Sequence, residues 1–223
     1  MKISILAGLV VAMSVSTAFA GGNGAYITQI GQTHKATVTQ SGTGQATYIS
    51  QSHVKNTATS TQSDARNYAD IKQNQQVGGT LNKVTSTQKG QDARFEAHQE
   101  GSSNTITSTQ GGLDNVARIA QVNTKQIVTN TQTGNGGVLE AWQIGGSNEL
   151  TNKDEGQLNS TSSIQNGTGN TATATFGGSS RESRSVFLQQ GNSNTASSTQ
   201  NAANDTSWIL QFGDNNDGTV TQN

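Results

Sequence analysis

Cysteine and proline are absent from the 223-residue chain, and only 4% of its residues are aromatic and 12% charged. Without cysteine, no disulfide can hold the fold together. With 30% hydrophobic residues, the chain is too poor in large apolar side chains for an ordinary core of its size. Disordered chains of low hydrophobicity are usually highly charged, so the low charge argues against simple disorder. Something other than apolar burial must therefore stabilise the chain.

The charges that are present nearly balance, with 13 Lys and Arg, 14 Asp and Glu, and a net charge of -1. A nucleic-acid partner would need a basic stripe, and an anionic membrane surface would need clustered lysines. We therefore expect no nucleic-acid partner and no membrane insertion. A nearly neutral chain also does not repel copies of itself.

Residues 1–20 differ in character from the rest of the chain. Lys2 provides a small positive charge, residues 3–15 are mostly apolar, and residues 18–20 have the sequence AFA of a cleavage site. The apolar run is shorter than the ~20 residues that a membrane-spanning helix needs. The pattern predicts a signal peptide over residues 1–20 and a secreted mature chain over residues 21–223.

Glutamine recurs every eleven residues over most of the chain. The period is lengthened twice, by four residues near residues 74–77 and by two near residues 177–180, and we interpret both places as loop insertions. The repeating glutamines are Gln29, Gln40, Gln51, Gln62, Gln73, Gln88, Gln99, Gln110, Gln121, Gln132, Gln143, Gln165, Gln189, Gln200, Gln211 and Gln222.

Other residue types keep fixed distances from these glutamines. Glycine is favoured two positions later, asparagine five positions later, and a small or branched apolar residue seven positions later. Positions five, seven and nine alternate in character with positions six, eight and ten, which is the period of a β-strand, and the glycine indicates a turn. The asparagines at position five are Asn56, Asn67, Asn104, Asn115, Asn148, Asn159, Asn170, Asn194 and Asn216.

Consecutive eleven-residue units are of two kinds, one with a threonine-rich strand such as KATVTQ and one without, such as VLEAWQ. Because the two kinds alternate, the true repeat has 22 residues, and the chain holds eighteen strands in nine strand-turn-strand rungs. One such unit cannot bury its inner face alone and must stack on its neighbours. The sequence therefore predicts an all-β fold, a single parallel β-solenoid over residues 21–223.

Stacking in register places glutamine over glutamine in two ladders, whose amides can hydrogen-bond as they do in cross-β structures. Asp154 and Phe176 occupy glutamine positions in the second ladder, and we expect a weak point there because a buried carboxylate without a partner is costly. We see no proline and no helical cap at either end of the stack. Open strand edges of this kind add further copies, so the chain is expected to polymerise.

The pattern Q-x-G-x-x-N-x-A-x-x-x-Q, seen at Gln189, Gly191, Asn194, Ala196 and Gln200, resembles the curlin repeat. The segment QSDARN at residues 62–67 is also similar to curlin, and the resemblance covers residues 23–223. It implies a structural subunit of curli, a bacterial functional amyloid of the biofilm matrix, or the surface nucleator of such fibres. It also implies a homopolymer outside the cell, a second curlin subunit and a dedicated secretion channel. Only residues 21–24 stand where the major subunit has a glycine- and asparagine-rich leader.

Catalytic and metal-binding motifs are absent from the sequence. His34, His53 and His98 lie far apart, in positions that other repeats fill with unrelated residues, so their spacing does not suit a metal ion. The glycines are explained by turns and form neither a phosphate-binding loop nor a nucleophile motif. We therefore expect no enzymatic activity, no cofactor and no metal.

Two functions of other classes compete with the fibre. The threonine strands put T-x-T on one outward face, as in an ice-binding solenoid, although the row is interrupted at Lys153 and Ser197. A monomeric adhesin would have a capped stack and a recognition insertion, and neither is evident. A ligand groove over the outward aromatic residues is conceivable, but surface or inter-fibril contacts are the plainer interpretation. These residues are Tyr26, Tyr48, Trp142 and Trp208.

Overall fold

The computed structural model describes residues 22–74 and 81–223. The predicted signal peptide, residues 1–20, and residues 75–77 of the first predicted insertion lie outside this part of the chain. One sheet, here named the odd sheet, comprises β1 (Gly24–Gln32), β3 (Ala46–Val54), β5 (Tyr68–Asn74), β7 (Arg94–Ser102), β9 (Val116–Thr124), β11 (Val138–Gly146), β13 (Ser160–Thr168), β15 (Arg184–Asn192) and β17 (Thr206–Phe212). The other, the even sheet, comprises β2 (Lys35–Thr43), β4 (Thr57–Ala65), β6 (Lys83–Gln91), β8 (Thr105–Leu113), β10 (Ile127–Gln132), β12 (Glu149–Asp154), β14 (Thr171–Phe176), β16 (Thr195–Gln200) and β18 (Asp217–Gln222).

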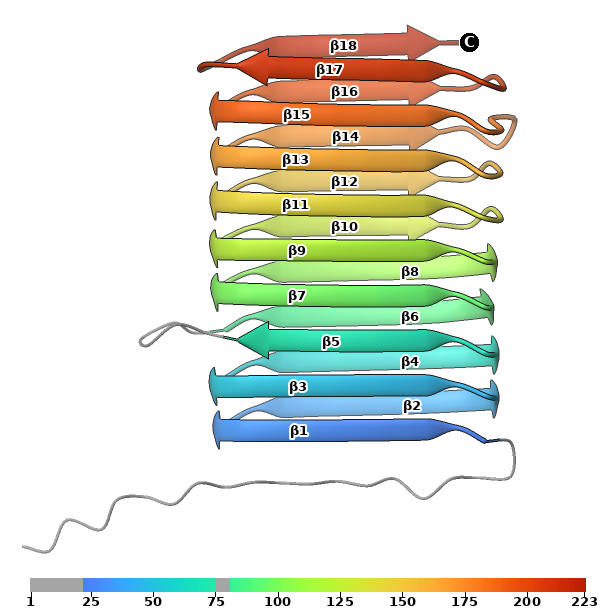
Figure 1. The fold of residues 1–223 in the computed structure, drawn as a ribbon, viewed down its shortest axis with the longest axis vertical. Helices are drawn as coiled ribbons and strands as arrows, with labels where there is room; N and C mark the ends of the chain where they lie inside the picture. Colours follow the sequence, from blue (N-terminus) through green and yellow to red (C-terminus); the bar gives the residue numbers. More distant parts are fainter. Residues whose placement is uncertain (1–21, 75–80) are drawn as a thin grey trace, which may run out of the picture.

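The two nine-stranded sheets stack their strands in chain order, one sheet in front of the other (Figure 1). Each strand pairs in parallel with the strand two places further along the chain, as Gln99, Gln121 and Gln143 do in consecutive rungs. The predicted all-β parallel β-solenoid of nine rungs, each of about 22 residues, is confirmed. No helix of the described residues is long and apolar enough to cross a membrane.

Side chains alternate between the space enclosed by the two sheets and the solvent. In β11, Leu139, Ala141 and Gln143 are buried, whereas Glu140 and Trp142 are exposed. The interior contains an apolar column of Ala, Val, Ile and Leu, and beside it rows of Gln, Asn and Ser. Three phenylalanines complete the apolar column, namely Phe95, Phe176 and Phe187. The core is thus narrow, and more than half of its buried residues are polar or charged and need hydrogen-bond partners.

Glycine at position two suits the corner between the sheets, where consecutive rungs approach each other closely, although His53, Asp64 and Asn123 take the same left-handed backbone at that position. Gly145 has a φ of +109°, and a Cβ there would lie 2.0 Å from the carbonyl oxygen of Gly167 in the next rung. The residue before the corner asparagine also has a left-handed backbone, with φ of 55° at Ser147 and 56° at Ser193. The sequence pattern G-x-x-N therefore specifies the corner through its backbone geometry.

Candidate functional site

An unbroken ladder of glutamine amides runs through the odd sheet. Each Nε2 donates a hydrogen bond to the Oε1 of the glutamine one rung further along the chain, at 2.7 to 2.9 Å. The same Nε2 also donates to a backbone carbonyl of the even sheet, as from Gln121 to Thr105 at 3.2 Å. The ladder contains Gln29, Gln51, Gln73, Gln99, Gln121, Gln143, Gln165, Gln189 and Gln211.

A second ladder follows the even sheet in two pieces. The amides of the first piece are joined in the same direction at 2.8 to 3.2 Å, and those of the second piece at 3.1 Å. The first piece contains Gln40, Gln62, Gln88, Gln110 and Gln132, and the second contains Gln200 and Gln222. All amide donors in both ladders point toward β17 and β18, so the stack has a direction.

The second ladder is interrupted at Asp154 and Phe176, which pair in register with the glutamines on either side. The expectation that the Asp154 carboxylate lacks a partner is wrong, because its Oδ1 accepts hydrogen bonds from Gly156 N at 3.0 Å and Asn159 Nδ2 at 2.9 Å. Aspartate is one methylene shorter than glutamine, and it binds the adjacent turn. Burial raises the pKa of the Asp154 carboxyl, and these two hydrogen bonds offset part of that rise.

The predicted asparagines lie at the corners and bind the backbone of neighbouring rungs. Asn104 Oδ1 accepts the backbone N–H of Gln126 at 3.1 Å, and its Nδ2 donates to the carbonyls of Glu100 and Asn123 at 3.1 and 3.0 Å. The asparagines therefore hold the corner of one rung against the next. Variants of this arrangement occur at Asn56, Asn67, Asn115, Asn148, Asn159, Asn170, Asn194 and Asn216.

Sequence reasoning missed corner residues of other types. Gln45 and Gln126 donate from Nε2 to corner carbonyls as the asparagines do, and His34 Nδ1 accepts the backbone N–H of Asn56 at 3.2 Å. Asn82 has the same role after the first insertion. Counting five positions from each repeating glutamine, instead of counting asparagines, would have found Gln45, Gln126 and His34.

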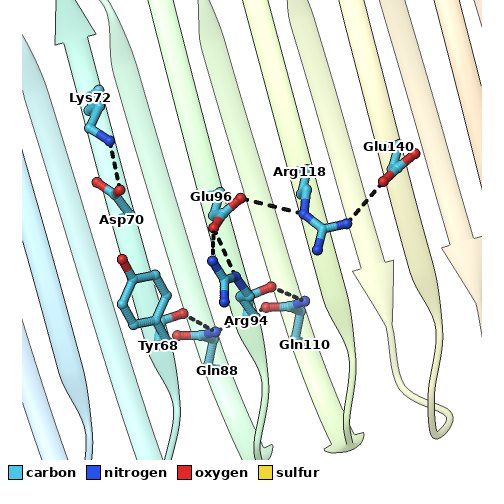
Figure 2. A network of polar contacts seen from close by, with 9 residues as sticks. All are labelled: Tyr68, Asp70, Lys72, Gln88, Arg94, Glu96, Gln110, Arg118 and Glu140. Atoms are coloured by element: carbon cyan, nitrogen blue, oxygen red, sulfur yellow. Dashed lines mark hydrogen bonds and ion pairs between the residues drawn. The ribbon is translucent and has the colours of Figure 1, made fainter.

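Charged side chains form ion pairs on the solvent face of the odd sheet: a continuous chain of pairs from β7 to β11, and a separate pair within β5 (Figure 2). Arg118 Nη1 lies 2.9 Å from a Glu140 oxygen, and Arg118 Nε lies 3.5 Å from an oxygen of Glu96 in the preceding rung. Because most of these groups are solvated, each pair contributes at most about 1 kcal/mol to stability. The ionic residues in Figure 2 are Asp70, Lys72, Arg94, Glu96, Arg118 and Glu140.

Exposed aromatic side chains lie on the same face, at both ends of the odd sheet and, for Trp142 in β11, between them. Tyr26 and Tyr48 stack in consecutive rungs, with ring centroids 4.9 Å apart and an interplanar angle of 7°. Trp208 in β17 is 58% exposed, and the guanidinium of Arg184 lies over its ring, 5.5 Å from the centroid. The structure therefore brings the two tyrosines together, and it places Trp142 and Trp208 in rungs distant from them.

The solvent face of the even sheet is a regular array of threonines. The first residue column contains Thr37, Thr59, Thr85, Thr107, Thr129, Thr151, Thr173, Ser197 and Thr219. The second contains Thr39, Thr61, Thr87, Thr109, Thr131, Lys153, Thr175, Thr199 and Thr221. Each column is broken once, at the two positions that the sequence indicates.

The described residues contain no group of three or more His, Cys, Asp or Glu side chains that could hold a metal ion. No protein-family model matches the chain, and no curated protein is significantly similar to it. The molecule is therefore characterised by its architecture, a parallel β-solenoid of nine rungs with stacked glutamine and asparagine side chains.

Proposed function

We propose that this chain is the structural subunit of an extracellular, amyloid-like fibre of the curli type, which grows by stacking copies on the ends of the solenoid. The observation that carries the proposal is the unbroken amide ladder from Gln29 to Gln211, which reaches both edge strands of the odd sheet. A ladder of this kind gains the same hydrogen bonds from each added rung, whether the rung belongs to the same chain or to another.

The terminal strands support growth at the ends. Within the described part of the chain, no strand pairs with the outer edges of β1, β2, β17 and β18. Edges of this kind pair readily with other chains unless charge, proline or a covering segment blocks them. The apolar side chains of Ile27, Val38 and Val220 are only partly buried at these ends. Addition of a copy would bury them, at roughly 25 cal/mol per Å² of apolar surface.

The resemblance of the repeats to curlin supports the cellular setting of the proposal. In this setting the chain is secreted by bacteria, leaves the cell through a dedicated channel, and assembles with itself and with a second curlin subunit at the cell surface. The fibre contributes to the biofilm matrix and to adhesion. Nine regular rungs favour the main structural subunit over the nucleator. The role is structural, without catalysis, cofactor or nucleic acid.

The test is self-assembly of the predicted mature chain, residues 21–223. The protein is purified in denaturant, the denaturant is removed, and thioflavin fluorescence and fibre diffraction are recorded. Fibres with reflections near ~4.8 Å and ~10 Å are the expected result, because these are the spacings between strands and between facing sheets. A β-rich protein that stays monomeric at tens of micromolar, without thioflavin signal, would contradict the proposal.

A second function, ice binding, is favoured by the in-register threonine columns of the even sheet. A flat, regular threonine array could order water at the spacing of the rungs. Thermal hysteresis by the soluble monomer would support this alternative. Fibres that form readily and have no effect on ice growth would exclude it.

A further inference from the structure

We infer that consecutive molecules join head to tail in a single register, with β17 and β18 of one copy against β1 and β2 of the next. This inference rests on the proposed function and specifies its partner surface, which is a second copy of the same chain. In this joint Gln211 lies against Gln29 and Gln222 lies against Gln40, so that both ladders continue across the boundary between molecules.

The amides at the two ends are complementary. At the β17/β18 end, Gln211 Nε2 donates to Thr195 O at 2.7 Å and has no ladder acceptor within the described residues. At the β1/β2 end, Gln29 Oε1 and Gln40 Oε1 have no ladder donor, although both side chains donate to the next rung. Two like ends would place donors against donors or acceptors against acceptors. Only unlike ends continue the bonding pattern, so the polymer has a direction.

The outward residues match in the same register. Continuing the pairing of β1 with β3 and of β15 with β17 places Trp208 against Tyr26, which already stacks on Tyr48. Both side chains are exposed in the single molecule, at 58% and 56%. The stack would therefore extend by one aromatic ring, and such a pair adds about 0.5–1.5 kcal/mol beyond the area that it buries. Phe212 would lie against Ile30 on the same face.

Charge is also complementary at the joint. Lys35 opens β2 and Asp217 opens β18, and the register of the even sheet places one against the other. Inside the molecule, Lys35 pairs with Thr57 and Asp217 with Thr195, so neither has a charged neighbour in its own column. Opposite charges at paired positions of adjacent strands stabilise the pairing, and like charges destabilise it.

The interior of the terminal rung is shaped to accept another rung. A hollow at the β17/β18 end is lined by Ile209, Gln211, Gly218 and Val220, among other residues. Gly218 stands where β2 has Ala36, so the last rung lacks a side chain at an inner position. A shift of two residues, the smallest that keeps inner side chains inside, would set Gln211 against Ile27 and break the ladder.

The experiment uses opposite charge reversals at the two ends of the chain. Lys35→Asp and Asp217→Lys each create a like-charged joint, and we expect each variant alone to leave about threefold to tenfold more residual monomer than the wild-type protein at low salt. Mixed in equal amounts, the two variants can alternate with opposite charges at every joint, and the residual monomer is expected to return to the wild-type level. Lys83→Asp is the matched control, because Lys83 occupies the same strand position inside the stack between two threonines.

If the wild-type protein forms fibres and the single variants assemble like it, the proposed joint is refuted and the fibre proposal stands. The same holds if the variants stay impaired when mixed. Absence of fibres from the wild-type protein overturns both.

A second readout follows Trp208 itself. The chain has two tryptophans, so Trp142→Phe leaves Trp208 as the only one. On assembly its emission is expected to shift to shorter wavelength as Tyr26 covers the ring, and Tyr26→Ala should reduce the shift. Fibres of the Trp142→Phe protein whose tryptophan emission matches that of the monomer overturn this register.

Discussion

Two adjacent glutamines in β15 allow the contribution of the amide ladder to be measured. Replacing one of them by alanine tests the ladder, and replacing the other is the control, since both variants lose the same atoms. Gln189 points into the interior and is fully buried, whereas Gln190 is exposed to solvent. Changing either residue to alanine removes the same atoms from neighbouring positions of one strand. The difference in the free energy of unfolding between Gln189→Ala and Gln190→Ala therefore reports on burial and on the interior hydrogen bonds of Gln189, namely its ladder bonds and its bonds to Thr171 O and Asn194 O.

The expected magnitude follows from the hydrogen bonds of Gln189. Its Nε2 donates to Gln211 Oε1 at 2.9 Å, and its Oε1 accepts from Gln165 Nε2 at 2.9 Å. Gln165 keeps two backbone acceptors, so Gln211 Oε1 is the buried atom that loses its ladder donor. An orphaned buried acceptor costs about 1–3 kcal/mol, and the lost methylene adds about 0.8 kcal/mol. We expect about 2–4 kcal/mol for Gln189→Ala, and about 0.5 kcal/mol or less for Gln190→Ala.

The assay is urea-induced unfolding followed by circular dichroism, at dilutions and times at which thioflavin detects no fibre. A difference of about 2 kcal/mol is roughly a 30-fold change in the equilibrium constant for unfolding, which is readily measured. If the two variants unfold with the same free energy, within about 0.5 kcal/mol, the ladder contributes no net stability and the reasoning is refuted.

Three further predictions use the same unfolding measurement. Burial raises the pKa of Asp154 above its ordinary value of 3.8. The folded protein is therefore most stable, as far as Asp154 is concerned, below pH 3.8, and this stability is lost as pH rises through the raised pKa of the folded state. Asp154→Asn should therefore stabilise the protein at pH 7, and this gain should vanish below pH 3.8; a gain independent of pH would contradict it. Gly145→Ala should destabilise the fold because its Cβ would lie 2.0 Å from a carbonyl oxygen, whereas Gly178→Ala, with open space around it, should have little effect; equal effects would disprove the corner argument. Phe187→Ala should cost about 3–5 kcal/mol by leaving a cavity in the narrow core, and a loss under about 1 kcal/mol would mean that the rungs collapse around it.

The architecture could be predicted from the sequence because the repeat of eleven residues, two per rung, is regular over most of the chain. A parallel solenoid allows no freedom in register once the position of each glutamine is known, so the pairing of Gln121 with Gln143 is fixed by counting 22 residues. The same counting, with the two insertions allowed for, places all sixteen predicted glutamines in two columns. The outward neighbours on either side of the first insertion are harder to predict, because Asp70 pairs with Glu96, which is 26 residues further along the chain instead of 22, only after the insertion has been placed correctly.

Other features of the ladders could not be predicted, because they depend on side-chain reach. Asp154 was expected to be unsatisfied, and it is not, since a shorter side chain can turn back to Gly156 N and Asn159 Nδ2. The direction of the amide bonds is equally invisible in the sequence, because glutamine has a donor and an acceptor on the same group. Only the three-dimensional arrangement shows that every Nε2 points the same way.

The two outer faces of the solenoid have different periods, and this difference would matter in bundles of the proposed fibre. Along the even sheet the threonine columns repeat with every rung, at ~4.8 Å, except at Ser197 and Lys153. Along the odd sheet the order of tyrosines, ionic residues and tryptophan recurs only once per nine-rung molecule, or every ~43 Å. Filaments touching through their threonine faces could slip past each other one rung at a time. Filaments touching through the odd sheet would match their charged and aromatic residues only at whole-molecule steps. The face through which filaments touch would therefore decide whether they can slide past each other under tension.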